Sequence, residues 1–192
     1  MKQYQHLYRN MNLSDYVRVY DNVIAPEHCQ SLMESFQAAQ DQQIMRDNAQ
    51  QYFSEINLNQ NDWYMNDLYA SVLDIRQRYW SDVGITQQMI NGQHDFEQFK
   101  MRHWNAARGD QCQPQVAVNN YNQARRFLCC IWNLNQVDVG GETVFLRLDQ
   151  ELTIPARAGQ VLVFPATWQY LYAETPALSD DRYSVHSYFH YS

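Results

Sequence analysis

Residues 126–145 read RFLCCIWNLNQVDVGGETVF, and this stretch decides the fold. Its first part, 127–134, is an apolar and aromatic run of strand length, and 143–148 is a second candidate strand after two glycines. Similar runs predict further strands at 99–102, 160–164 and 182–191. The second half of the chain is therefore expected to be an antiparallel β-structure.

The last of these predicted strands alternates cleanly between two faces. Arg182, Ser184 and His186 fall on one face, whereas Tyr183 and Val185 fall on the other, because successive side chains of a strand point to opposite sides. Arg182 and Ser184 are therefore expected to point the same way.

The first part of the chain carries helical patterns. Residues 25–27 (Ala-Pro-Glu) open a helix, since Pro suits its first position and Glu suits its positive N-terminus. The apolar positions that follow at helical spacing are Cys29, Leu32, Met33 and Phe36. A second helix is predicted over 62–79, with Asp62 as its N-cap.

Helices followed by many antiparallel strands indicate an α+β fold with a two-sheet barrel or sandwich. The length of 192 residues fits one domain. We expect a single domain over 1–192, with a mainly helical support region at 1–95 and the β-core at 96–192.

Composition limits the partners. The net charge is −7 and Arg125-Arg126 is the one tight basic cluster, which argues against nucleic acid and anionic membranes. Residues 1–16 lack the apolar core of a signal peptide, and no stretch approaches a membrane span. The four cysteines show no metal-like spacing, and Cys129 and Cys130 should point to opposite faces of a strand. A cytoplasmic protein with reduced thiols is expected.

An ordered set of motifs joins these strands. After the quoted stretch come Pro155, Gly159, Phe164-Pro165 and the triplet 182–184 (Arg-Tyr-Ser). With residues 140–143 (GGET), this order resembles the catalytic core of the 2-oxoglutarate/Fe(II) oxygenases, in the prolyl-4-hydroxylase-like branch. The resemblance covers roughly 96–192, with a weaker similarity at 17–36. It implies a double-stranded β-helix, a jelly-roll or cupin-like barrel, with the N-terminal helices packed on one sheet.

The same resemblance locates positions where the family holds iron with two histidines and one carboxylate. Counting back ten residues from Arg182 places Tyr172 at the distal histidine position. After Gly109-Asp110, the family's His-x-Asp pair falls on Gln115 and Ala117, or on Gln113 and Gln115 if the alignment slips. None of these side chains is a strong ligand for Fe(II). Loss of iron binding is therefore expected.

The cosubstrate side of the resemblance is intact. Arg182 and Ser184 match the family's clamp for the carboxylate of 2-oxoglutarate, since a guanidinium fork fits a carboxylate. This implies a site for 2-oxoglutarate or another carboxylate. The alternative is an arginine kept for a buried ion pair with Asp180, Asp181 or Glu142.

Three functions remain open. The favoured function is that of a binding or regulatory pseudoenzyme. No cofactor is expected for it, and its partner would be a small carboxylate, a peptide or a protein such as an active homologue. The alternative is an active 2-oxoglutarate-dependent hydroxylase that uses Fe(II) at a rearranged site built from His103, His186 and an acid. The third is a metal-free binder whose pocket is lined by aromatic residues, namely Trp104, Trp132, Trp168, Tyr170 and Tyr172. A nucleophilic Cys112 beside His103 is a further, weaker reading.

Overall fold

The strands of the chain pair antiparallel into one curled sheet. The computed structural model describes residues 12–60, 65–90, 92–148 and 150–192. The order within the sheet of 12 strands is β1-β10-β7-β12-β5-β3-β6-β11-β8-β9, with β2 paired to β3 and β4 to β12. The strands are β1 (Arg18–Tyr20), β2 (Ile44–Asp47), β3 (Gln51–Asn57), β4 (His94–Phe96), β5 (Lys100–Trp104), β6 (Gln111–Gln115), β7 (Arg126–Asn133), β8 (Thr143–Phe145), β9 (Leu152–Ile154), β10 (Gln160–Pro165), β11 (Tyr172–Glu174) and β12 (Arg182–Tyr191).

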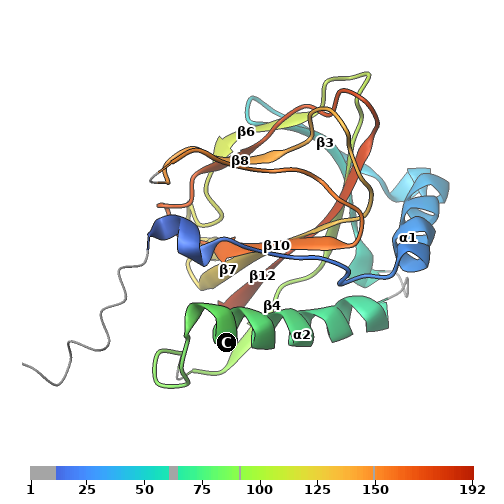
Figure 1. Cartoon of the computed structure of the whole chain (residues 1–192). Helices are drawn as coiled ribbons and strands as arrows, with labels where there is room; N and C mark the ends of the chain where they lie inside the picture. The colour runs from blue at the N-terminus through green and yellow to red at the C-terminus, as the bar shows by residue number, and fades with distance from the viewer. Residues whose placement is uncertain (1–11, 61–64, 91, 149) are drawn as a thin grey trace, which may run out of the picture.

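The sheet curls over into two layers. Figure 1 shows β10, β7 and β12 in one layer and β6 and β8 in the other, with the helix α2 beneath the first layer. This arrangement confirms the predicted α+β fold with a double-stranded β-helix. The strands predicted around 127–134, 160–164 and 182–191 are all present within a residue or two.

Both predicted helices are present and cover one side of the barrel. The helix α1 spans Pro26–Ala38 with Pro at its start, and α2 spans Met65–Val83. The predicted N-cap Asp62 lies outside the described residues. The buried stripes of these helices pack on the outward side chains of β7 in a shared core that includes Leu32, Phe36, Leu68, Val72, Ile75, Leu128, Cys130 and Trp132. The helices are amphipathic because they cover this apolar face of the sheet.

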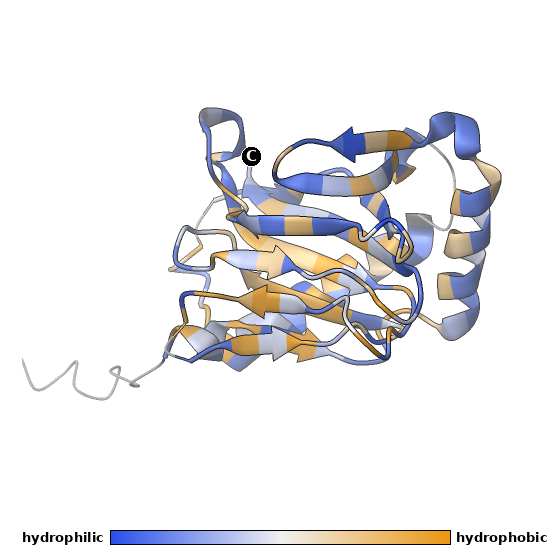
Figure 2. Cartoon of the chain, turned by 90° about the horizontal axis from the view of Figure 1, so that it is seen from above, coloured by the Kyte–Doolittle hydropathy of each residue, from blue (hydrophilic) through white to orange (hydrophobic). Residues whose placement is uncertain are grey.

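The opposite side of the same strands forms the barrel interior. Cys129 and Ile131 of β7 pack there with Leu162, Phe164 and Tyr172. Cys129 and Cys130 therefore point to opposite faces, as predicted, and all four cysteines are free. Figure 2 shows the hydrophobic colouring concentrated on the central strands.

The sequence missed part of the N-terminal region. Residues 44–57 form β2 and β3, and β3 pairs with both β5 and β6. The strand β3 thereby joins the two layers, so the sheet includes chain from the region before residue 96 that was expected to be mainly helical. The segment contains many amides and few β-branched residues, which hid its strand character. No helix in the described ranges is long and apolar enough to cross a membrane.

Candidate ligand site at the barrel cleft

The structure brings Gln115 and Tyr172 together inside the barrel. They are directly opposite each other on the paired strands β6 and β11. The Gln115 Nε2 donates a hydrogen bond to the Tyr172 hydroxyl at 3.2 Å, and the Gln115 Oε1 accepts one from Gln51 at 3.0 Å. Both ends of the Gln115 amide are therefore used by protein groups.

A bulge in β6 decides which residues face inward. Tyr172 pairs with Gln115, whereas Glu174, two residues on, pairs with Cys112, so β6 holds one extra residue. Pro114 lies within this irregular stretch, where a missing N–H is tolerated. Gln113 is exposed, so its side chain is not part of the interior. The structure thus favours Gln115 over Gln113 as the inward position.

Ala117 follows on the same segment and completes the group of predicted ligand positions. Its side chain is buried among the interior residues, and its carbonyl oxygen accepts a hydrogen bond from Arg126 at 3.0 Å. Gln115, Ala117 and Tyr172 all line one cleft of about 240 Å³, here called the barrel cleft. Its other lining residues are Arg46, Gln51, Glu55, Glu97, Gln98, Lys100, Arg102, Val116, Asn119, Gln123, Arg126 and Tyr188.

These residues do not fit an iron site. Alanine has no donor atom, and a glutamine carbonyl that already accepts a hydrogen bond is a poor ligand for Fe(II). Burial raises the pKa of Tyr172 well above its usual value, so the phenolate that a metal would need is disfavoured. Within the described ranges, no group of three His, Cys, Asp or Glu side chains is placed to hold a metal ion.

Arg182 and Ser184 lie on one buried face of β12, as predicted, but protein groups already occupy them. The Arg182 Nη1 lies 3.1 Å from Oε1 of Glu174, and its Nη2 donates to Asn133 Oδ1 at 3.0 Å. The Ser184 hydroxyl accepts a hydrogen bond from the Trp104 indole at 3.1 Å and contacts His186 Nε2 at 2.9 Å.

The alternative, in which Arg182 forms a buried ion pair, named the wrong acidic partners. The partner of Arg182 is Glu174, which is fully buried on β11, whereas Asp181 binds His103 at 2.7 Å and Glu142 binds Thr175. Sequence reasoning missed Glu174 because its strand is only three residues long. Its position two residues after Tyr172 was the available signal, since alternate residues of a strand share a face.

A second arginine extends this buried network. Arg102 of β5 contacts Glu55 at 3.1 Å, His186 Nδ1 at 3.2 Å and Glu174 at 3.8 Å. Burial, reinforced by Arg102 and Arg182, lowers the pKa of His186 well below its usual value, so the imidazole is neutral. Burial alone would raise the pKa of Glu55, but Arg102 and Arg46 lower it overall. The interior of the barrel is therefore a set of paired charges around a neutral histidine.

The proposed rearranged metal site does not form. His103 points to the helix side of the sheet, where its ring stacks on Tyr183 with centroids 4.5 Å apart. His186 points into the barrel, so the two histidines lie on opposite faces and cannot share an ion. The nucleophile reading fails as well, because burial raises the pKa of Cys112 to about 12 and keeps the thiol protonated.

The prediction of a pocket lined by aromatic residues was also largely wrong. Of the five aromatic residues expected to line it, only Tyr172 lines the barrel cleft. Trp132 is packed beneath the helices, Trp104 is buried beside Phe53, and Trp168 is 66% exposed. The cleft is lined mainly by amides and charged groups instead.

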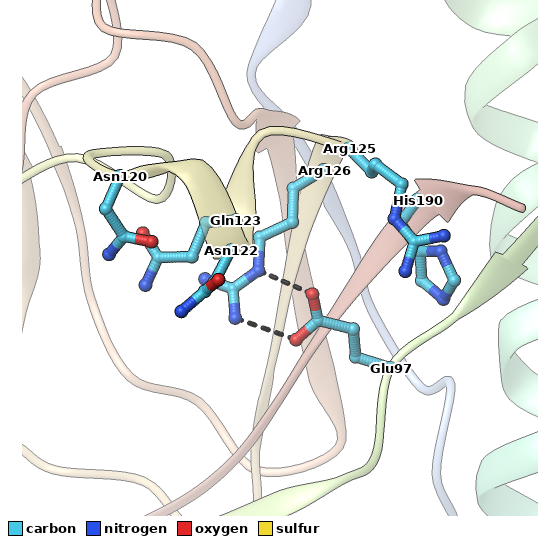
Figure 3. Close-up of a pocket in the computed structure, with 7 residues that line it drawn as sticks. All are labelled: Glu97, Asn120, Asn122, Gln123, Arg125, Arg126 and His190. Carbon is cyan, nitrogen blue, oxygen red and sulfur yellow. Dashed lines mark hydrogen bonds and ion pairs between the residues drawn. The ribbon is translucent and has the colours of Figure 1, made fainter.

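A second hollow of about 440 Å³ lies beside the cleft, and Glu97, Gln123 and Arg126 line both. Figure 3 shows its residues, with the Arg126 guanidinium held by Glu97 through two hydrogen bonds of 2.6 and 2.7 Å. Arg125 and His190 lie on the other side of Glu97 (Figure 3). This hollow is a polar surface depression that the Arg126–Glu97 pair borders.

Comparison with known proteins places the fold. No family model matches the sequence, and no curated protein matches it. Solved structures do match. A prolyl hydroxylase from Trichoplax adhaerens, in complex with a hypoxia inducible factor oxygen degradation domain peptide fragment, aligns with a TM-score of 0.73 at 12% identity, over 92% of this chain and 84% of that one.

Two other matches agree with it. A Pseudomonas putida prolyl-4-hydroxylase aligns with a TM-score of 0.71 at 14% identity, over 92% and 93% of the two chains. The viral collagen prolyl hydroxylase of Paramecium Bursaria Chlorella virus-1, as its 2OG complex, aligns with a TM-score of 0.69 at 11% identity, over 92% and 97%. The chain therefore has the fold of the prolyl-4-hydroxylase-like branch of the 2-oxoglutarate/Fe(II) oxygenases.

Proposed function

We propose that this chain is an oxygenase-fold protein that has lost iron binding and catalysis and serves as a binding or regulatory module. One observation carries the proposal. The Gln115 amide is hydrogen-bonded on one side to Tyr172 and on the other to Gln51, at the positions where the resemblance locates two iron ligands. A metal ion there would have to break both bonds and would gain only weak donors.

The barrel cleft supports an anionic ligand. Its lining holds four cationic side chains, Arg46, Lys100, Arg102 and Arg126, against two acidic ones, Glu55 and Glu97, although the protein as a whole carries −7. The ion pairs of the described residues use the three arginines but leave Lys100 without a carboxylate partner. An excess of cationic groups in a cleft attracts carboxylates and acidic peptides.

A peptide is the ligand class that we favour. One structure with this fold is a complex with a peptide fragment, which supports a peptide ligand for this chain. The amides that line the cleft, among them Gln98, Gln115 and Asn119, suit the alternating donors and acceptors of a peptide backbone. An acidic segment of a partner protein, an active homologue included, would satisfy both features.

Metal titration tests the loss of chemistry. Calorimetry with Fe(II) under argon, with and without 2-oxoglutarate, is expected to show no saturable binding, and assays with 2-oxoglutarate should give no succinate. Stoichiometric Fe(II) binding coupled to succinate formation would overturn the proposal.

Ligand capture tests the binding role. Acidic peptides from a random library should bind the wild-type protein, and Lys100→Gln should weaken them several-fold because it removes the cation without a carboxylate partner. Arg78→Gln is the matched control, since Arg78 pairs with Asp74 on the outer helix. Equal effects of the two variants on peptide affinity would show that the peptides bind outside the cleft.

A further inference from the structure

The feature that the proposed function does not use is the buried pair of Arg182 and Glu174. The side chains of both residues are almost completely buried, with 1% and 0% exposed. In the oxygenases that this chain resembles, the arginine at this place meets the carboxylate of a small ligand. Here it meets a carboxylate of its own chain.

The guanidinium of Arg182 is divided between two partners. Its Nε and Nη2 both point at the Asn133 side-chain oxygen, at 3.3 and 3.0 Å, which leaves Nη1 for the Glu174 carboxylate at 3.1 Å. Arg102 approaches the other Glu174 oxygen at 3.8 Å. The carboxylate thus lies between two guanidinium groups, as a bound anion would.

The pair is held by charge and not by well-aligned hydrogen bonds. Both carboxylate oxygens of Glu174 and Nη1 of Arg182 are buried without a hydrogen bond of good geometry among the described residues. Buried polar atoms normally find such partners, and a fixed side chain on a short strand has little freedom to improve its angle. A free small carboxylate, able to rotate, would meet the same donors in better alignment.

The cleft and this pair are separate spaces. Arg102 lines the barrel cleft, but Arg182, Ser184 and Glu174 do not. A ligand in the cleft therefore reaches Arg102 but not Arg182, whose side chain is buried outside the cleft lining.

We infer that Glu174 is a built-in substitute for the ligand carboxylate of this fold, so that the native barrel takes no 2-oxoglutarate at Arg182. Removing the Glu174 side chain should turn the site into a receptor for small carboxylates. The inference rests on the proposed function in that it takes Arg182 as the vestige of a cosubstrate clamp.

Chemical rescue of Glu174→Ala tests the inference. The variant should unfold at a lower temperature than wild type, because Arg182 loses its counter-charge, and sodium formate or acetate should restore about 3–6 °C of Tm relative to sodium chloride at equal ionic strength. Succinate and 2-oxoglutarate probe whether a longer acid also fits. Wild-type Tm should respond to none of these salts beyond the chloride control.

Two variants separate rescue at Arg182 from general salt effects. Glu174→Gln fills the same space without charge and should not be rescued. Glu174→Ala combined with Arg182→Met removes the cation and should also not respond to acetate. Acetate that raises the Tm of all three variants equally would overturn the inference, as would a Glu174→Ala protein that responds no more than wild type.

A fourth measurement applies if Glu174→Ala does not fold. Wild-type protein titrated with 2-oxoglutarate should show no heat and no shift in Tm, and saturable binding that Arg182→Lys weakens would contradict a self-occupied site. The iron titration of the wild type uses no Glu174 variant, so the proposed function and this inference can fail independently.

Discussion

The hydroxyl of Tyr172 accepts a hydrogen bond from the amide of Gln115 across two neighbouring strands, at 3.2 Å. The two residues stand in direct register, so their side chains converge at positions where the sequence resemblance predicts two iron ligands. The Gln115 amide and the Tyr172 hydroxyl satisfy each other, with Gln51 on the far side of the amide.

Introducing the family's three ligand types at the predicted positions should create a metal site. In Gln115→His combined with Ala117→Asp and Tyr172→His, two imidazoles and a carboxylate would face the barrel cleft, and this set suits first-row divalent metals. Calorimetry with Ni(II) on tag-free protein should show one saturable site that wild type lacks.

The matched control places the same residue types at the alternative positions, two residues earlier on β6. Gln113→His, Gln115→Asp and Tyr172→His introduce the same residue types, but the side chain of residue 113 is exposed within the bulged stretch. If the shifted variant binds Ni(II) as well as the first, the assignment of Gln115 and Ala117 is wrong.

Arg182 is expected to matter for stability. Arg182→Met leaves the Glu174 carboxylate buried opposite an apolar side chain, and breaking a buried pair on one side costs about 3–5 kcal/mol of unfolding free energy. Adding Glu174→Leu to the same protein should recover most of that loss, because two apolar side chains of similar size replace the pair. Urea denaturation measures both effects, and a double variant no more stable than Arg182→Met would contradict the coupling.

The sequence predicted the parts of this barrel that are long or strongly patterned. The run at 127–134 is apolar on both sides because β7 is covered by helices on one face and by the barrel interior on the other. The alternation at 182–191 survives in β12 because each face has its own environment. Such patterns depend on which faces of a strand are buried, and the order of apolar and polar residues along the strand reflects this.

What escaped prediction depends on distant pairing. Glu174 lies on a strand of three residues next to Thr175-Pro176, and only its partners on β6 and β12 make it an interior group. His186 lies on a predicted strand and His103 directly follows another, but the register of β5 against β12 decides that they face opposite sides. A one-residue change of register would reverse that result, so sequence spacing alone could not settle it.

The double glycine of the GGET motif should prove structural. Gly140 has a φ of +76° and forms a bridge to Ala177, and a side chain there would overlap the carbonyl oxygen of Pro176. Gly140→Ala should therefore cost at least ~2 kcal/mol more than Gly84→Ala, since residue 84 has a similar φ of +71° but open space around it. If the two variants lose equal unfolding free energy in urea denaturation, the positive φ alone explains the need for glycine at residue 140.

The buried neutral histidine should make the fold sensitive to mild acid. Burial and the two arginines lower the pKa of His186 in the folded state, whereas in the unfolded chain it titrates near its ordinary value of 6.5. Below pH 6.5 the unfolded chain therefore binds a proton that the folded protein refuses, and stability falls as the pH falls, by about 1.4 kcal/mol per pH unit for one group. Glu55 contributes little to the slope in this window, because its pKa is lowered in the folded state and its contribution is lost mainly as the pH falls from its ordinary value of 4.5 toward that lowered value.

Urea denaturation at pH 7.5, 6.5 and 5.5 isolates this effect. His186→Gln removes the titrating group and keeps a polar side chain beside Ser184, so its stability should fall less steeply than that of wild type between pH 6.5 and 5.5. His190→Gln, a change on the same strand near its exposed end, is the control and should keep the wild-type slope. Parallel slopes for wild type and His186→Gln would mean that the imidazole is already protonated in the folded barrel. The imidazolium and the two arginines around it would then need a negative charge in addition to those of Glu55 and Glu174.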